Sequence, residues 1–84
     1  MVYDVVSVEP MDHLVLRVHF SDGTEGEVRF ETSHLEGVFA ALKDPDYFKQ
    51  VKCTHGFVEW PDDLDLAPDA MYDAVKESGV WILA

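Results

Sequence analysis

Hydrophobic and polar residues alternate along much of the first third of the chain. The alternation is cleanest over residues 13–20 and 24–31, and a stretch rich in β-branched residues runs from Val2 to Val8. A period of two places successive side chains on opposite faces of a strand, so these three segments predict β-strands. Pro10 cannot donate to a strand ladder, and we expect a turn there after the first strand. The predicted inward side chains of the next two strands are Leu14, Leu16, Val18, Phe20, Val28 and Phe30.

The turn between the second and third strands follows from matching their two faces. A two-residue loop, Asp22-Gly23, would set the apolar Phe20 against the charged Glu25. A three-residue loop that begins at Ser21 keeps the inward apolar residues together and gives Gly23 the left-handed position of a type I turn with a bulge. On the outer face, this register predicts the cross-strand pairs His19–Glu25, Arg17–Glu27 and His13–Glu31.

Helical spacing replaces the alternation after residue 31. Four apolar residues recur at the i, i+3, i+4, i+7 spacing of an amphipathic helix: Leu35, Val38, Phe39 and Leu42. Ser33 and Glu36 are spaced to form a capping box at its start. Pro45 ends this helix because the residue before a proline avoids helical angles. Residues 46–50 then predict a short second helical turn, with Phe48 facing the core.

Two short strands and a last helix complete the predicted order. Residues 51–54 and 57–60 predict strands, and Pro61 closes the second of them. Residues 62–65 predict a loop in which Asp65 accepts hydrogen bonds from free N–H groups at the start of the last helix. That helix begins at Pro68 and ends at Ser78-Gly79. The apolar segment Val80–Leu83 follows it as a last strand or as a flap over the core.

The order β-β-β-α-β-β-α, with a short helical turn after the first helix, predicts an α+β fold with a mainly antiparallel sheet. A chain of 84 residues makes a single domain, residues 1–84.

Charge and cysteine content narrow the class of function. The chain has 17 acidic and 6 basic residues, which gives a net charge of −11. Phosphate backbones attract basic proteins, and the six cations are spread along the chain, so we expect no direct nucleic-acid binding. A single cysteine, the lack of a signal-peptide pattern and the lack of an apolar run of about 20 residues predict a soluble cytoplasmic protein without membrane contact.

The segment from Glu59 to Tyr72 is distinctive because it combines Trp60-Pro61-Asp62 with Asp65-Leu66-Ala67-Pro68-Asp69. Together with Phe20-Ser21-Asp22-Gly23 and Tyr47-Phe48-Lys49-Gln50-Val51, it resembles the small bacterial proteins of the domain-of-unknown-function family number twenty-four forty-two. The resemblance covers nearly the whole chain and implies a compact α+β fold with no assigned activity or catalytic residue. Longer members of that family append a helical DNA-binding segment, which this sequence does not contain. Some members are suspected of acting beside toxin-like or regulatory partners.

The aspartates 62, 63 and 65 are the most concentrated candidate chemistry. Loops rich in carboxylates bind divalent cations. An EF-hand loop would need a glycine that this segment does not have, and Pro68 lies inside its window. We therefore favour hydrogen bonding to loop and helix N–H groups over metal binding, and an acidic patch that binds a partner is the third interpretation.

Histidines, the cysteine and large aromatic residues are the remaining candidates. His13 and His19 share a predicted strand face and would bind zinc with a third ligand, although cross-strand pairing with glutamates is the simpler explanation. Cys53 is followed two residues later by a histidine, which is a weak signal, and a packed strand position is favoured. Trp60, Tyr72 and Trp81 either cover the core or anchor an interface, and the core is favoured for Trp60.

The leading hypothesis is a non-enzymatic protein-interaction or regulatory module without a cofactor, the acidic partner of a basic protein. Its predicted surface consists of Trp60, Asp62, Asp63, Asp65, Asp69, Tyr72 and Trp81. The alternative is a metal-binding protein or small metal-dependent enzyme that uses His13, His19 and the aspartates of residues 62–65. A third possibility is a homodimer in which residues 80–83 add a strand to a second copy.

Overall fold

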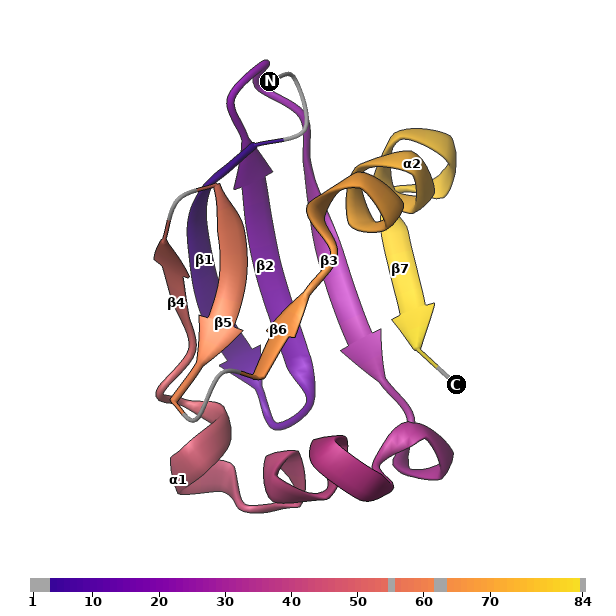
Figure 1. Cartoon of the computed structure of the whole chain (residues 1–84). Helices are drawn as coiled ribbons and strands as arrows, with labels where there is room; N and C mark the ends of the chain where they lie inside the picture. Colours follow the sequence, from indigo (N-terminus) through magenta and orange to yellow (C-terminus); the bar gives the residue numbers. More distant parts are fainter. Residues whose placement is uncertain (1–3, 55, 62–63, 84) are drawn as a thin grey trace.

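A computed structural model describes residues 4–54, 56–61 and 64–83 (Figure 1). It is an α+β fold built on two sheets, one with strand order β1-β2-β3-β7 and a smaller one with order β4-β5-β6. The larger sheet contains β1 (Val5–Asp12), β2 (Val15–Phe20), β3 (Glu25–Phe30) and β7 (Val80–Leu83). The smaller sheet contains β4 (Lys52–Thr54), β5 (Phe57–Trp60) and β6 (Leu64–Leu66). The helical elements are the 3-10 helices η1 (Thr32–His34) and η2 (Gly37–Lys43) and the α-helices α1 (Pro45–Phe48) and α2 (Pro68–Ser78).

The predicted hairpin of β2 and β3 is confirmed with its register. Leu16 lies opposite Val28, Arg17 opposite Glu27 and His19 opposite Glu25. The three-residue turn is also confirmed, because the Phe20 N–H donates to the Thr24 carbonyl at 2.8 Å and Gly23 has a φ of 91°. Register and turn agree because both keep the apolar side chains of the hairpin on one face.

The lower end of this hairpin differs from the prediction. The ladder ends at Val15 opposite Arg29, so the expected strand pair of His13 with Glu31 is wrong. Leu14 has a φ of 67°, a left-handed conformation that takes the chain out of the strand. The expected turn at Pro10 is also wrong, since β1 continues through Pro10 to Asp12. Proline is tolerated there because β1 is an edge strand of the larger sheet.

The first predicted helix is a pair of 3-10 helices. Gly37, the first residue of η2, has a φ of 59°, a left-handed angle that a continuous α-helix does not allow. The capping box of Ser33 and Glu36 is not formed, because neither 3-10 helix has a side-chain cap. Leu35 and Leu42 are nevertheless buried as predicted. The short helix α1 follows, and its start is capped where the Asp44 carboxylate accepts from the Asp46 N–H at 3.0 Å.

The predicted loop over residues 62–65 contains the start of a strand. Leu64–Leu66 forms β6 and pairs antiparallel with β5, so that Leu64 lies opposite Trp60 and Leu66 opposite Val58. Both leucines are buried and the intervening Asp65 is exposed, which is the alternation of a half-buried strand. The smaller sheet lies against β1, and the Val5 N–H donates to the Gly56 carbonyl at 2.8 Å (Figure 1).

The last helix and strand join the two sheets. Helix α2 follows β6 in the sequence. It ends at Gly79, which has a φ of 82°, as predicted, and strand β7 comes directly after it. Strand β7 pairs with β3 in parallel, so the tail is a strand and not a flap. Among the described residues, no helix is long and apolar enough to cross a membrane.

The core lies between the inner face of the larger sheet and the elements that cover it. Trp60 is 1% exposed, and its Nε1–H donates to the Phe48 carbonyl at 2.9 Å. Phe30 and Phe48 meet edge to face with ring centroids 5.9 Å apart, and Phe30 meets Trp60 in the same way at 6.0 Å. Such pairs contribute about 0.5–1.5 kcal/mol beyond the apolar area that they bury. This aromatic cluster connects β3, α1 and β5.

Close approach of α2 to the larger sheet requires Gly26 on β3. A Cβ atom at this position would lie 2.5 Å from Val75 Cγ1 and 2.6 Å from the Gly79 carbonyl oxygen. We expect Gly26→Ala to lower the free energy of unfolding by about 2 kcal/mol, as overpacking does, measured by urea denaturation. Adding Val75→Ala removes the side-chain clash but not the clash with the Gly79 carbonyl, so the double variant should not regain wild-type stability. Unchanged stability of Gly26→Ala would contradict the packing described here.

Candidate functional site

Exposed carboxylates gather on the outer side of α2. Asp69, Asp73 and Glu77 follow one another at intervals of four residues, which places them along one side of the helix. All three are exposed, and Asp65 on β6 is exposed as well. We call these four residues the acidic stripe. The predicted residues Asp62 and Asp63 lie outside the described residues.

Asp65 does not have the predicted structural role. The N-cap residue of α2 is Ala67, which has no side-chain cap, and Pro68 occupies the first turn. Proline needs no hydrogen-bond acceptor there because it has no N–H. Asp69 lies in the first turn as predicted, where a carboxylate is favourable against the helix dipole, and its Oδ1 accepts from the Ala70 N–H at 2.9 Å. Asp65 is therefore free to face solvent.

Tyr72 attaches α2 to the β2–β3 turn. Its hydroxyl donates to Asp22 Oδ2 at 2.5 Å, and its ring meets Phe20 edge to face at 5.1 Å. The other oxygen of Asp22 accepts from the Thr24 N–H at 2.9 Å. The Tyr72 hydroxyl, followed by the Thr24 N–H, lowers the pKa of the Asp22 carboxyl from its ordinary 3.8 to about 2. Lys76 lies beside this contact, with Nζ 3.5 Å from Thr24 Oγ1 and 5.9 Å from the Tyr72 ring centre.

The two tryptophans of the predicted surface differ in their access to solvent. Trp60 is buried in the aromatic cluster, so it cannot contact a partner. Trp81 is half-buried on β7 and packs against the edge of the core. Asp65, Asp69, Tyr72 and Trp81 thus remain as described candidates for contact. Asp73 and Glu77 join them because the helical period places both on the same side as Asp69.

The histidines proposed as metal ligands lie in different environments. His19 Nδ1 is 3.1 Å from Ser7 Oγ, and its Nε2 is 2.7 Å from Glu25 Oε2, in agreement with the predicted cross-strand pair. His13 lies in the β1–β2 turn, with its ring edge-on to Phe48 at 5.6 Å. Within residues 4–54, 56–61 and 64–83, no three His, Cys, Asp or Glu side chains are grouped as a metal site.

Cys53 packs in β4 as expected. Its thiol donates to the Val5 carbonyl oxygen at 2.7 Å, and burial raises the pKa of the thiol. A raised pKa lowers the thiolate fraction, so the environment of Cys53 is not that of an activated nucleophile.

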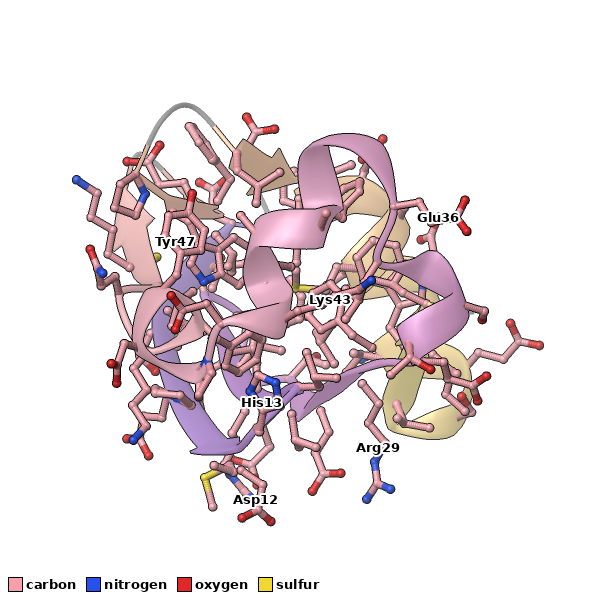
Figure 2. The ribbon with its side chains drawn as sticks, turned by 90° about the horizontal axis from the view of Figure 1, so that it is seen from below. Asp12, His13, Arg29, Glu36, Lys43 and Tyr47 are labelled. Atoms are coloured by element: carbon pink, nitrogen blue, oxygen red, sulfur yellow. The ribbon has the colours of Figure 1, made fainter. Side chains whose placement is uncertain are left out.

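A hollow that the sequence did not reveal lies at the lower end of the molecule. It has a volume of about 450 Å³ and lies between the end of β1 and helix α1. Its lining residues are Pro10, Met11, Asp12, His13, Pro45, Phe48 and Lys49. Figure 2 shows this end from below, with Asp12 at the margin of the molecule and His13 nearer the middle. Two chain segments more than 30 residues apart form it, and no local pattern in either segment indicates their meeting.

Comparison with known proteins identifies the family. Residues 5–77 match the family described as "Protein of unknown function (DUF2442)", so the chain belongs to that family, as its Trp-Pro-Asp segment predicted. No curated protein and no solved structure matches the chain significantly. The family model extends from β1 to the last turn of α2 and does not include β7.

The contact between Tyr72 and Asp22 makes stability depend on pH in acid. Because folding lowers the pKa of Asp22, the contact stabilises the fold above the ordinary pKa of 3.8, and this contribution is lost as the pH falls toward about 2. We expect Tyr72→Phe to raise the pKa of Asp22 in a carboxyl NMR titration, and to flatten this part of the stability curve. Asp73→Asn is the control, since it removes a carboxylate from α2 without touching Asp22. An unchanged Asp22 titration in Tyr72→Phe would show that the hydroxyl is not the cause.

Proposed function

We propose that this chain is a non-enzymatic protein-interaction module whose acidic stripe binds a basic surface on another protein. The observation that carries the proposal is the exposed row of Asp69, Asp73 and Glu77 on α2, with Asp65 exposed on the preceding strand. A row of carboxylates on a rigid helix presents negative charge at fixed intervals. Such a surface steers a basic partner toward it and favours one orientation of binding.

The distribution of positive charge supports this proposal. Arg17, Arg29 and Lys52 each lie within 4 Å of a glutamate: Arg17 of Glu25 at 3.2 Å, Arg29 of Glu27 at 2.8 Å and Lys52 of Glu59 at 3.6 Å. These cations therefore neutralise carboxylates of the sheets. On α2 the basic residue is Lys76, which is directed toward Thr24 and Tyr72. Carboxylates therefore outnumber basic residues on α2, and part of the net charge of −11 lies on this helix without a compensating cation.

The attachment of α2 also suits a binding surface. The helix is held by the Tyr72–Asp22 hydrogen bond, by Met71 and Val75 in the core, and by its close approach to Gly26. The carboxylates of the stripe take no part in these contacts, apart from the bond of Asp69 to the adjacent Ala70 N–H. Binding at the stripe would thus need little ordering of the backbone, which lowers the entropic cost of association.

The test compares two variants that lose the same number of charges. One has Asp65, Asp69 and Asp73 changed to Asn and Glu77 changed to Gln. The control has Glu9, Glu31 and Glu36 changed to Gln and Asp46 changed to Asn, all of them exposed residues outside the stripe. Each protein, tagged at the N-terminus, is used to capture partners from native lysate at low and high salt. We expect wild type and control to retain a stoichiometric basic partner at low salt, and the stripe variant to lose it.

Circular dichroism should show that both variants keep the wild-type fold. Equal loss of the partner in both variants would mean that overall charge, and not the stripe, causes binding. Failure of the wild-type protein to retain any stoichiometric partner at low salt would contradict the proposal itself.

Self-association through β7 is a second candidate, favoured by the position of that strand. It lies at an edge of the larger sheet, and the side chain of Ile82 is 54% exposed. An exposed edge strand offers unpaired backbone groups to a strand of another copy. Part of this edge is blocked, because the Ser78 hydroxyl lies 3.1 Å from the Val80 carbonyl oxygen.

Substitution at Ile82 distinguishes this candidate from a monomer. Removing β7 would also remove Trp81 and Leu83 from the core, so a single exposed side chain is the better choice. If β7 joins two copies, light scattering should give a dimer mass for wild type and a monomer mass for Ile82→Lys. Val6→Lys, at an exposed position of β1, is the control and should leave the mass unchanged. A monomer mass for the wild-type protein at high concentration would rule out the dimer.

A further inference from the structure

The hollow beneath the β1–β2 turn has the size and chemistry of a small-ligand site. Its volume of about 450 Å³ falls within the range of roughly 300–1,000 Å³ typical of such sites. The end of β1 supplies one wall and helix α1 the other. It is separate from the acidic stripe, since none of the four stripe residues lines it.

The floor and walls of the hollow are largely apolar. Phe48 is fully buried and forms the floor, while the rings of Pro10 and Pro45 stand in the two walls. Met11 lines the same space and is 54% exposed. An apolar group of a ligand would cover Met11 and contact the proline rings.

The turn above the hollow is held in a strained conformation. Leu14 is the described residue other than glycine with a positive φ, 67°, and its side chain packs against the core. Strained backbone is concentrated at functional sites, where the surrounding structure holds it. Here it turns the chain so that His13 meets Phe48 edge to face and lines the hollow, in place of continuing the strand.

Two opposite charges line the hollow without neutralising each other. Asp12 comes from the end of β1 and Lys49 from the end of α1. Among the described residues, neither forms an ion pair with the other or with any other side chain. A ligand that carries both charges would pair with both residues.

We propose that the hollow binds a free apolar α-amino acid. The α-ammonium would pair with Asp12, the α-carboxylate with Lys49, and the side chain would lie on Phe48 between Met11 and the prolines. This ligand class matches each part of the lining: two opposite charges at the rim, an apolar floor, and a volume suited to a molecule of about a dozen heavy atoms. An apolar carboxylic acid or an apolar amine would satisfy only one of the two charges.

The test uses L-phenylalanine and two analogues that each lack one charge, phenylacetate and phenethylamine. Each is titrated into the ¹⁵N-labelled protein and followed by amide chemical shifts. We expect L-phenylalanine to bind in the millimolar range, with saturable shifts at Met11, His13 and Lys49. Each analogue should bind more weakly by a factor of up to about five, because an exposed charge pair contributes up to about 1 kcal/mol.

Two substitutions assign the charges separately. Lys49→Gln should weaken the binding of L-phenylalanine and phenylacetate by a factor of up to about five and leave that of phenethylamine unchanged. Asp12→Asn should weaken L-phenylalanine and phenethylamine to the same extent and leave phenylacetate unchanged. Lys52→Gln and Glu9→Gln are matched controls, since they make the same changes of charge at exposed positions that do not line the hollow.

Three results would overturn the proposal. The first is the absence of any saturable shift up to the solubility limit of L-phenylalanine. The second is saturable binding whose shifts map away from β1 and α1. The third is equal affinity for L-phenylalanine and both analogues, which would reduce the hollow to a nonspecific apolar contact. None of these results bears on the acidic stripe, so the two proposals stand or fall independently.

Discussion

The fold depends most on the burial of Trp60 beneath the larger sheet. Its indole lies between Phe30 of β3 and Phe48 of α1, and its N–H is satisfied by the Phe48 carbonyl. A buried indole needs such a partner, because an unpaired N–H in an apolar interior costs about 1–3 kcal/mol. The bond fixes α1 relative to β5, and the hydroxyl of Tyr47 on α1 also donates to the Pro61 carbonyl just after that strand. Because α1 is fixed in this way, Phe48 is available as the floor of the hollow and Lys49 stands at its rim.

Local patterns predicted those parts of the fold that local chemistry determines. The β2–β3 hairpin has alternating side chains and a glycine at its left-handed position, so one register satisfies both. The end of α2 at Gly79 was predictable for the same reason. Strand β6 was missed because a Leu-Asp-Leu segment of three residues is too short to show a period, and it is a strand only because Trp60 and Val58 lie opposite it. The 3-10 helices were mistaken for an α-helix because apolar spacing does not report the backbone angle of Gly37.

The candidate site was predicted to a smaller extent than the fold. Asp69 and the acidity of its surroundings could be read from the sequence, because charge and helical period are local properties. The partner of Tyr72, Asp22, lies 50 residues away, and no pattern in either segment pointed to the other. The hollow was invisible for the same reason, since its two walls come from residues 10–13 and 45–49. Contacts between distant segments depend on how the core packs. The sequence determines this packing through many weak interactions acting together, and no short segment contains them all.

The parallel pairing of β7 with β3 has a consequence for how the chain is made. Residues 80–83 become the second neighbour of a strand that was synthesised about 50 residues earlier. During translation the β1–β2–β3 meander emerges first, and β3 then presents an unpaired edge until α2 and β7 have left the ribosome. Closing so long a loop is slow, because its entropic cost precedes the contacts that offset it. The nascent chain is therefore most exposed to wrong pairing at β3, where Glu25, Glu27 and Arg29 place charges along the open edge.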